Sequence, residues 1–299
     1  MKRKESMGRR TFLVSNYLFL SLTGILCVLP FINLLAISFS SQTAVSSGQV
    51  TFLPVGFTLS SYKFIAKSPV FINAFMVSIE RVVLGLLVNM ALIVMTAYPL
   101  SKDKEKFRMR NVYSWFFVIT ILFNAGMIPT YMVVKYTGFL DSIWSLILPG
   151  ALPVFSMLVA MNFFRTLPKE LEEAAFIDGA SHMTTLFKII LPVSKPVLAT
   201  VGLFCLVGHW NSWFDGLLYM DRQEHYPLQS YLQTVIINPE VFFRNTKNVS
   251  SDIDNLLGFI NVRTTKAAQL FIATLPVLIA YPFLQKYFTT GLVLGSVKG

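Results

Sequence analysis

The sequence predicts an all-α integral membrane protein with six transmembrane helices and both termini in the cytoplasm. Hydrophobic residues make up 54% of the 299 residues and charged residues only 13%, whereas soluble domains carry about 25% charged residues. The mean hydropathy is +0.61, and several long stretches lack charge entirely. The 27 Phe and 11 Tyr, without a low-complexity run or a repeat, exclude a disordered chain, a coiled coil and a collagen-like fibre.

Six stretches are long and apolar enough to cross a bilayer. A helix needs about 20 mostly apolar residues to cross a hydrocarbon layer ~30 Å thick, and all its backbone polar groups must be satisfied within the segment. The predicted spans cover about residues 17–39, 71–100, 111–134, 142–164, 191–208 and 267–286. The first is predicted to be an uncleaved anchor, because its apolar stretch is too long for a signal peptide. Together they form a transmembrane domain, residues 17–288, between a basic segment, residues 1–16, and a C-terminal tail, residues 289–299.

The distribution of Lys and Arg predicts the orientation, because positively charged loops resist translocation. With the N-terminus inside, the inner segments hold 16 of the 25 Lys and Arg in 72 residues, and the outer segments hold nine in 107 residues. Both termini and the loop 165–192 are therefore predicted to be cytoplasmic. The net charge of +10 then reflects topology and contact with anionic lipid rather than binding of nucleic acid.

The sequence contains no recognisable catalytic or metal-binding constellation. Cys27 and Cys205 lie within apolar spans, where a free Cys behaves as a small hydrophobe. His182, His209 and His225 have no partner at metal-ligand spacing, and we interpret them as solvated or interfacial. The patterns of an esterase elbow, a zinc protease and a nucleotide-binding phosphate loop are missing. We therefore expect no enzymatic activity, no metal and no cofactor in this chain.

The loop 165–192 has the pattern of two short helices joined by a sharp turn. Pro168 and the acidic residues after it favour a helix start. Gly179 provides a conformation that ends this helix, and Ser181 can cap a second one. A face of small residues at helical spacing would let another backbone approach closely; its members are Leu171, Ala174, Ala175 and Asp178. Spacing alone fits any amphipathic inner loop equally well.

This loop resembles the EAA loop of the membrane subunits of ABC importers. The matching residues are Glu173, Ala174, Ala175, Asp178, Gly179, Ala180, Phe187 and the run 190–192. Elsewhere, the chain is similar to carbohydrate-uptake permeases of the maltose-transporter type, in residues 54–62, 97–101, 285–288 and 295–299. Residues 210–215, Trp-Asn-Ser-Trp-Phe-Asp, look most like those of permeases for oligosaccharides. The resemblance covers nearly the whole chain and implies a multi-pass protein of a prokaryotic cell membrane.

The resemblance implies that the loop is a coupling helix seated in a groove of a cytoplasmic ATPase dimer. Glu173 would offer a charged contact to the ATPase, the two alanines close packing, and Gly179 the turn. The partner ATPase would bind ATP and Mg²⁺, and its closure would switch the permease between inward-open and outward-open states. Further implied partners are a second homologous permease subunit and an extracytoplasmic sugar-binding protein. The implied ATPase-coupling residues are Glu173, Ala174, Ala175, Asp178, Gly179 and Ala180.

The longest predicted outer loop, residues 209–266, mixes charged and aromatic residues. Long ordered loops are commonly functional, so we expect this loop to dock the binding protein and to cover the substrate cavity. The alternative is a plain solvated loop.

Polar residues within spans are costly unless they face protein or water, so they nominate a substrate path. Amide groups and aromatic rings also suit sugar hydroxyls and sugar ring faces. The candidates are Asn89, Asn124, Thr130, Ser156, Asn162, Trp210, Asn211 and Trp213. Helix packing and interfacial Trp placement would explain them as well. Glu80 and Arg81 are interpreted as contacts at the outer interface or between subunits.

Three other functions stay open at this point. The chain could be an ABC permease for a non-sugar solute. A stand-alone secondary transporter would need its own coupling-ion site, usually intramembrane carboxylates or broken helices, and no Asp or Glu lies at mid-depth in the predicted spans. A membrane enzyme or scaffold would not depend on an ATPase.

Overall fold

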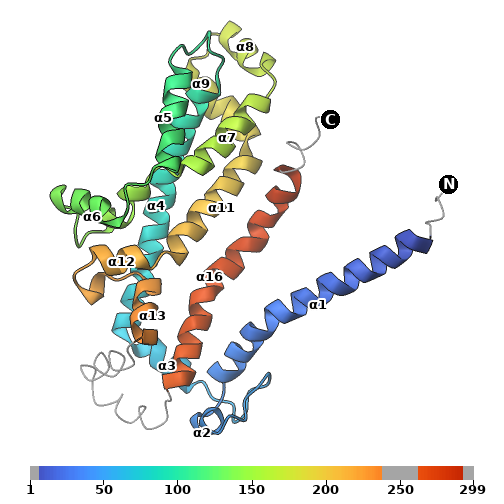
Figure 1. The fold of residues 1–299 in the computed structure, drawn as a ribbon, viewed down its shortest axis with the longest axis vertical. Coiled ribbons are helices and arrows are strands. Elements are labelled where there is room, and N and C mark those ends of the chain that lie inside the picture. Colours follow the sequence, from blue (N-terminus) through green and yellow to red (C-terminus); the bar gives the residue numbers. More distant parts are fainter. Residues whose placement is uncertain (1–6, 238–261, 292–299) are drawn as a thin grey trace. The chain divides into compact units, whose positions relative to one another are not determined.

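The computed structural model describes residues 7–237 and 262–291, and all regular structure within these residues is helical (Figure 1). The described residues form two compact units. Unit 1 takes in the described residues up to position 69 and those from 234 to 274. Unit 2 takes in those from 70 to 233 and from 275 onward. Each unit is described separately below.

Unit 1 is dominated by α1 (Met7–Ser38), whose most apolar window has a mean hydropathy of 2.3 and no buried residue. A helix that presents apolar side chains all round suits a lipid environment. The helices α2 (Gln42–Ser46) and α3 (Ser60–Lys67) follow, and Ser41 caps α2 by accepting a hydrogen bond from the Ala44 amide.

A small core holds the described part of unit 1 together. Ile37, Val45 and Ala267 are buried against one another. Beside them, Ser61 Oγ donates a hydrogen bond of 3.1 Å to Thr264 Oγ1. The long sequence separation of these partners shows that the start of α16 packs with α1 to α3.

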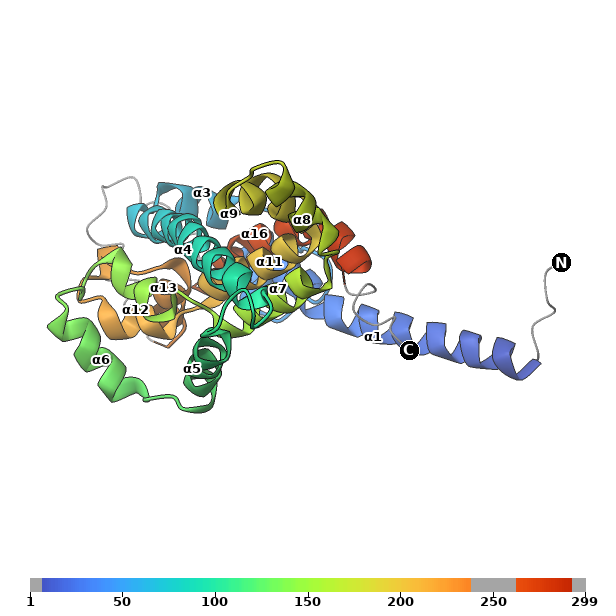
Figure 2. The ribbon, with the colours of Figure 1, turned by 90° about the horizontal axis from the view of Figure 1, so that it is seen from above.

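Unit 2 contains the remaining helices. The long helices α4, α7 and α11 lie alongside one another, with the short helices α8 and α9 at one end of them (Figures 1 and 2). Both α13 and α16 contribute residues to the two units. The helix bounds are α4 Pro69–Ser101, α5 Arg110–Leu122, α6 Met127–Tyr136, α7 Val154–Thr166, α8 Glu170–Ile177, α9 His182–Thr185, α10 Leu191–Val193, α11 Lys195–Asn211, α12 Phe214–Tyr219, α13 Leu228–Ile237 and α16 Val262–Gly291. Short 3₁₀ turns cover Ile143–Leu146, Leu148–Gly150 and Gln223–His225, and a π-helical turn covers Leu186–Ile190.

The core of unit 2 lies between α4, α7 and α11. Ile93 and Ala97 of α4, Met157 and Ala160 of α7, and Val201 of α11 are all fully buried. The alanines let the helix backbones approach closely, as small residues do in membrane bundles. This core fixes the three helices whose ends carry the two sites described below.

Three predicted spans are bent pairs of helices rather than single straight helices. The prediction of one helix over 111–134 is corrected: α5 and α6 meet at an angle of 115°. Between them Gly126 takes a φ of 87°, and its amide donates a hydrogen bond of 2.8 Å to Asn124 Oδ1. The predicted span 142–164 begins with 3₁₀ turns and bends by 50° before α7, and the segment before α11 meets it at 85°. Pro149, Pro153 and Pro196 lie at or beside these two breaks, where each removes a backbone donor.

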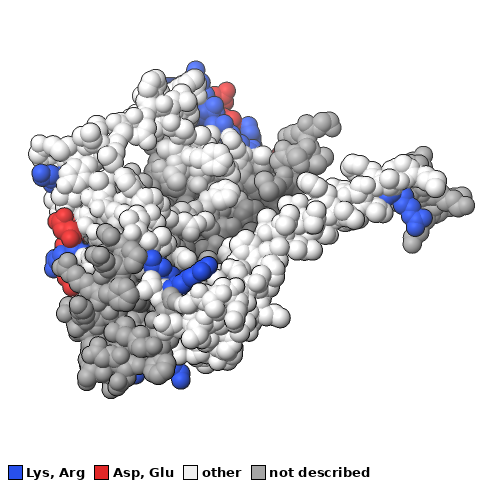
Figure 3. All heavy atoms as spheres, turned by 60° about the horizontal axis from the view of Figure 1, so that its bottom comes forward, with Lys and Arg blue, Asp and Glu red and all other residues white. Residues whose placement is uncertain are grey.

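By length and composition, α1 and α4 are each able to cross a membrane, and up to five spans result if each bent pair counts as one. The helix α16, on which the sixth predicted span falls, is not among them and contains Pro276 and Pro282. Six spans and cytoplasmic termini therefore stay predictions. Figure 3 shows the charged side chains gathered in a few places on the face that it draws, with broad uncharged surface elsewhere.

Candidate functional site

The loop 165–192 has the predicted helix, turn and second helix. The helix α8 begins with three glutamates in its first turn, which favour a helix N-terminus electrostatically. Gly179 takes a φ of 81° after it, a backbone conformation that L-residues rarely adopt. Ser181 Oγ then accepts a hydrogen bond of 3.2 Å from the Thr184 amide and caps α9. We call residues 165–192 the coupling loop from here on, after the role that the resemblance implies for them.

The predicted coupling residues differ in exposure. Ala175 is buried within the chain, with 5% of its surface exposed, so its small side chain serves packing inside the loop. Glu173, Ala174, Asp178 and Gly179 are exposed, and Ala180 is half-buried. Three large apolar side chains on the loop are exposed: Ile177, Met183 and Phe187, at 86%, 56% and 54%. Of these, only Phe187 had been singled out from the sequence. An exposed apolar surface of this kind commonly marks a protein contact.

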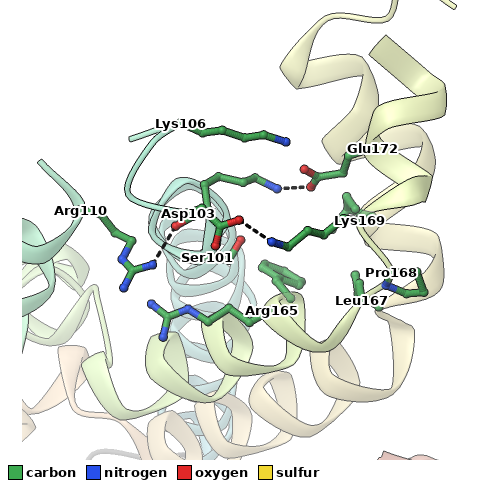
Figure 4. A pocket seen from close by; sticks show the side chains of 12 residues that line it. Ser101, Asp103, Lys106, Arg110, Arg165, Leu167, Pro168, Lys169 and Glu172 are labelled. Atoms are coloured by element: carbon green, nitrogen blue, oxygen red, sulfur yellow. Dashed lines mark hydrogen bonds and ion pairs between the residues drawn. The ribbon is translucent and has the colours of Figure 1, made fainter. Parts of the chain in front are cut away.

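Two ion pairs join the coupling loop to the segment after α4 (Figure 4). Lys102 pairs with Glu172 of α8, and Lys169 Nζ lies 2.6 Å from Asp103 Oδ2. The hydrogen bond from Lys169 lowers the pKa of Asp103 and raises that of Lys169. Burial lowers the pKa of Lys102, and Glu172 opposes this effect. The start of α8 is thus tied to the end of α4.

A second polar site is a cavity of about 430 Å³ within unit 2. We call it the polar cavity. It lies between the middle of α4, the C-terminal half of α11, the 3₁₀ turns Ile143–Leu146 and Leu148–Gly150, the start of α7 and α12. The residues that line it are Arg81, Asn89, Ser145, Leu146, Pro149, Gly150, Pro153, Ser156, Phe204, Cys205, Gly208, His209, Ser212, Asp215 and Tyr219.

A buried ion pair lies at one end of the polar cavity. Only 3% of the Arg81 side chain is exposed, and its Nη1 donates a hydrogen bond of 3.1 Å to Asp215 Oδ1. The Asp215 carboxylate also accepts hydrogen bonds from Ser212 Oγ and the Gly216 amide, at 2.8 and 2.9 Å. Arg81 further donates to the carbonyl of Leu146 at 3.3 Å. The pair therefore joins α4, α12 and the first 3₁₀ turn.

The structure corrects the interpretation of Arg81 as a contact between subunits. The partner of Arg81 belongs to the same chain and lies 134 residues away, so Arg81 is not a contact between subunits. Glu80, its neighbour, is exposed. Of the two residues, only Glu80 is therefore free to contact another subunit. No local spacing in the sequence links Arg81 to Asp215, which had been placed with the outer loop.

An amide–imidazole pair, Asn89 and His209, also lines the polar cavity. His209 Nε2 donates to the Asn89 amide oxygen over 3.1 Å, and the Asn89 nitrogen then donates to the carbonyls of Gly85 and Ala151 at 3.1 and 3.0 Å. The imidazole lies directly over Gly85, where a Cβ atom would come within 2.5 Å of its Nε2 atom. A side chain at position 85 would therefore fit only if the His209 ring moved away.

The variant Gly85→Ala is expected to displace the His209 ring and to break its bond to Asn89. Overpacking of this kind costs about 1–3 kcal/mol, so the melting temperature of the purified protein should fall although Ala favours a helix. Gly202→Ala on α11 is the control, since its Cβ would meet only ordinary contacts at 3.8 Å and beyond. Equal melting temperatures for the two variants would contradict this packing.

The structure brings only some of the predicted path residues together. Asn89 and Ser156 are buried and line the polar cavity. Trp210 is buried too, with its ring 5.8 Å from that of Phe75. The other predicted path residues do not line the polar cavity. Asn162 and Asn211 are exposed.

Asn124 supports the turn between α5 and α6, and Thr130 Oγ1 donates to the Gly126 carbonyl of the same turn. Trp213 is 41% exposed and packs edge-on against Phe214. Beyond Asn89 and Ser156, the polar side chains of the cavity that sequence reasoning missed are Arg81, Ser145, His209, Ser212, Asp215 and Tyr219.

A third cluster surrounds Asp141, in the loop after α6. Arg222 Nε and His225 Nδ1 each lie 2.8 Å from its carboxylate oxygens. Burial by itself raises the pKa of Asp141, but the hydrogen bonds from Arg222 and His225 outweigh it and lower the pKa to about 2. The carboxylate therefore holds the segment after α12 in place.

Stability is expected to depend on the charge of Asp141. Because its pKa in the folded state lies below the ordinary value of 3.8, the stabilisation is present above about pH 4 and is lost as the pH falls toward about 2. The melting temperature should fall through this window in the wild type and less in Asp141→Asn, which should already be less stable at pH 7. Asp221→Asn, at an exposed neighbouring carboxylate, is the control. The account fails if Asp141→Asn and the wild type lose stability in parallel.

Comparison with known proteins defines the class. The family model for the inner membrane component of binding-protein-dependent transport systems matches residues 92–293. The chain belongs to this family and is a permease subunit of an ABC importer.

Relatives match it over nearly its whole length. The chain is 41% identical to Protein LplC of Bacillus subtilis (strain 168) over 97% of its own length and 96% of that protein. It is 38% identical to the polygalacturonan/rhamnogalacturonan transport system permease protein YtcP of the same organism, over 98% and 100% of the two chains. Its fold matches a chain in the crystal structure of a bacterial ABC transporter involved in the import of the acidic polysaccharide alginate. That match has a TM-score of 0.85 and 31% identity, and it covers 96% of this chain and 100% of the other.

Proposed function

We propose that this permease subunit carries an oligosaccharide across the bacterial cell membrane, driven by a separate cytoplasmic ATPase. The observation that carries the proposal is the similarity over nearly the whole chain to YtcP and to the alginate importer, whose substrates are polysaccharides or derive from them. The similarity spans the coupling loop and the polar cavity alike. A permease that resembles sugar importers over nearly its whole length is most simply a sugar importer itself.

The coupling loop is the proposed seat of the ATPase. Its exposed Ile177, Met183 and Phe187 offer an apolar surface, and Glu173 beside them offers a charge-assisted contact. The ion pairs of Lys102 and Lys169 tie α8 to the end of α4. A push on α8 would therefore reach α4, which also lines the polar cavity. This is a route for rigid-body switching between inward-open and outward-open states.

The polar cavity is the proposed part of the substrate path within this chain. Its amide, imidazole, hydroxyl and guanidinium groups are hydrogen-bonding partners for sugar hydroxyls. Most of them are held in place by bonds to other helices, as described for Asn89 and Arg81. Such fixed polar groups lower the cost of transferring a hydrated sugar out of water.

Two further partners complete the proposal. A second homologous permease subunit would pair with this chain, and an extracytoplasmic binding protein would deliver the sugar. The docking surface predicted for the loop 209–266 stays a prediction, and residues 238–261 of that loop lie outside the described residues. ATP and Mg²⁺ would bind to the ATPase.

Uptake in a deletion strain tests the proposed function. Cells that lack this gene should lose uptake of one class of labelled oligosaccharides, and the wild-type gene should restore it. Neutral and uronic-acid oligosaccharides are supplied separately, with labelled amino acids as the control solute. Unchanged uptake of both oligosaccharide classes, or a loss confined to amino acids, would overturn the assignment to carbohydrates.

A further inference from the structure

A pocket of about 180 Å³ lies between the end of α4, the start of α5, the end of α7 and the start of α8 (Figure 4). Its wall is rich in cations. The five basic residues that line it are Lys102, Lys106, Arg110, Arg165 and Lys169, against two acidic ones, Asp103 and Glu172. We call it the basic pocket.

Both carboxylates of the basic pocket already have a cation. Glu172 pairs with Lys102, and Asp103 pairs with Lys169. Asp103 also attenuates the charges of Lys106 and Arg110 at longer range. Among the described residues, no carboxylate forms an ion pair with Lys106, Arg110 or Arg165. The basic pocket therefore carries an excess of three positive charges.

The two guanidinium groups have donors to spare. Arg110 Nη1 donates to the carbonyl of Lys102 at 3.1 Å, but its buried Nε has no partner within the described chain. Arg165 Nη2 donates to the carbonyl of Leu100 at 3.0 Å. The two arginines lie close enough for their charges to repel each other, and Figure 4 shows both guanidinium groups on the same side of Asp103. Asp103 offsets this repulsion in part, and a bound anion would offset it further.

We propose that the basic pocket binds a phosphate group, held by Arg110 and Arg165, while the Lys106 ammonium lies on the other side of Asp103 (Figure 4) and adds to the positive charge of the pocket. Arginine recognises phosphate through two parallel hydrogen bonds, and lysine adds a point charge. The pocket lies where the apolar helices α4 and α7 end. With the orientation predicted from the sequence, this end faces the cytoplasmic headgroups, where basic pockets between helices suit anionic lipids. The phosphate thus comes from an anionic phospholipid or, as the other source of the same chemistry, from free phosphate in the cytoplasm.

A bound phosphate would join the ends of α4 and α7 beside the coupling loop. It would complete the polar contacts that already tie this loop to α4. This proposal does not depend on which solute the permease carries. Its test measures phosphate binding rather than uptake, so it can succeed or fail independently of the proposed function.

The test uses the purified transporter complex in detergent and measures its melting temperature as a function of added ligand. The probes are dioctanoyl-phosphatidylglycerol, dioctanoyl-phosphatidylcholine and sodium phosphate. We expect phosphatidylglycerol to raise the melting temperature in a saturable way and phosphatidylcholine to leave it unchanged. An equal response to sodium phosphate at the same concentration would identify free phosphate as the ligand, and a much weaker response would identify the lipid.

Variants locate the site. Arg110→Gln and Arg165→Gln should each weaken the apparent affinity about tenfold or more, since a charge-assisted hydrogen bond is worth about that factor. Arg108→Gln is the matched control, because Arg108 is exposed in the same segment and does not line the pocket. If the Gln variants fold poorly, Arg110→Lys is used instead, because it keeps the positive charge but removes the two parallel N–H donors of the guanidinium group. The responses of the wild type to the three probes then still show whether phosphate binds. No response of the wild type to phosphatidylglycerol or phosphate, an equal response to phosphatidylcholine, or unchanged affinity in the Gln variants would overturn the proposal.

Discussion

Gly179→Val is expected to abolish transport while leaving the protein in the membrane. Gly179 has a φ of 81° and open space around the position of a Cβ atom, so the substitution acts on the backbone alone. An L-residue in this region costs about 1–2 kcal/mol, and a β-branched residue costs more. The turn would open and α8 would point away from the ATPase, so uptake and ATPase stimulation should fall about tenfold or more.

Two variants make this result specific. Gly138→Val imposes the same backbone strain, since Gly138 has a φ of 75° and equally open surroundings, but it lies after α6 and should keep most of the uptake. Gly179→Asn should retain part of the function, because Asn tolerates the left-handed conformation. Near-normal uptake by Gly179→Val, or equal losses in Gly179→Val and Gly138→Val, would remove the turn from the mechanism.

Asp215→Ala is expected to be among the most destabilising substitutions in unit 2. It leaves the Arg81 guanidinium buried, at 3% exposure, without its counterion, and breaking a buried ion pair costs about 3–5 kcal/mol. The yield of folded protein and the melting temperature in detergent should both fall sharply. Glu80→Gln, next to Arg81 but exposed, should change neither.

A double substitution separates the ion pair from its surroundings. Arg81→Met combined with Asp215→Leu removes both charges and should recover part of the stability lost in Asp215→Ala, because no unpaired charge stays buried. If the double variant were as unstable as Asp215→Ala, the hydrogen bonds of Asp215 to Ser212 and Gly216 would explain the loss instead of the ion pair.

The elements that the sequence predicted correctly depend on local patterns. The long apolar runs of α1 and α4, and the helix, turn and cap around Gly179, are each visible in consecutive residues of the sequence. The break between α5 and α6 was missed, since a count of apolar residues is the same for a straight and a broken helix. In that stretch Gly126 and Pro129 were the only local signals of a break.

The polar cavity was predictable only in part. Asn89 and Ser156 could be nominated because polar residues are rare in apolar spans. The pairing of Arg81 with Asp215 and of Asn89 with His209 joins positions 134 and 120 residues apart, and depends on how α4, α11 and α12 pack. The same holds for the basic pocket, whose cations come from residues 102–110 and from residues 165–169, at the end of α7 and just after it. Their clustering follows from tertiary structure alone.

Cross-linking of the coupling loop to the ATPase tests the central claim most directly. Cysteine would be placed at Ile177, which is 86% exposed, and separately at Tyr136, which is 79% exposed at the end of α6, in a chain with Cys27 and Cys205 replaced. The account predicts that a bifunctional thiol reagent joins the Ile177→Cys chain to the ATPase, that bound ATP changes the yield, and that Tyr136→Cys gives no such product. An ATPase that is joined through Tyr136→Cys but not through Ile177→Cys would contradict it.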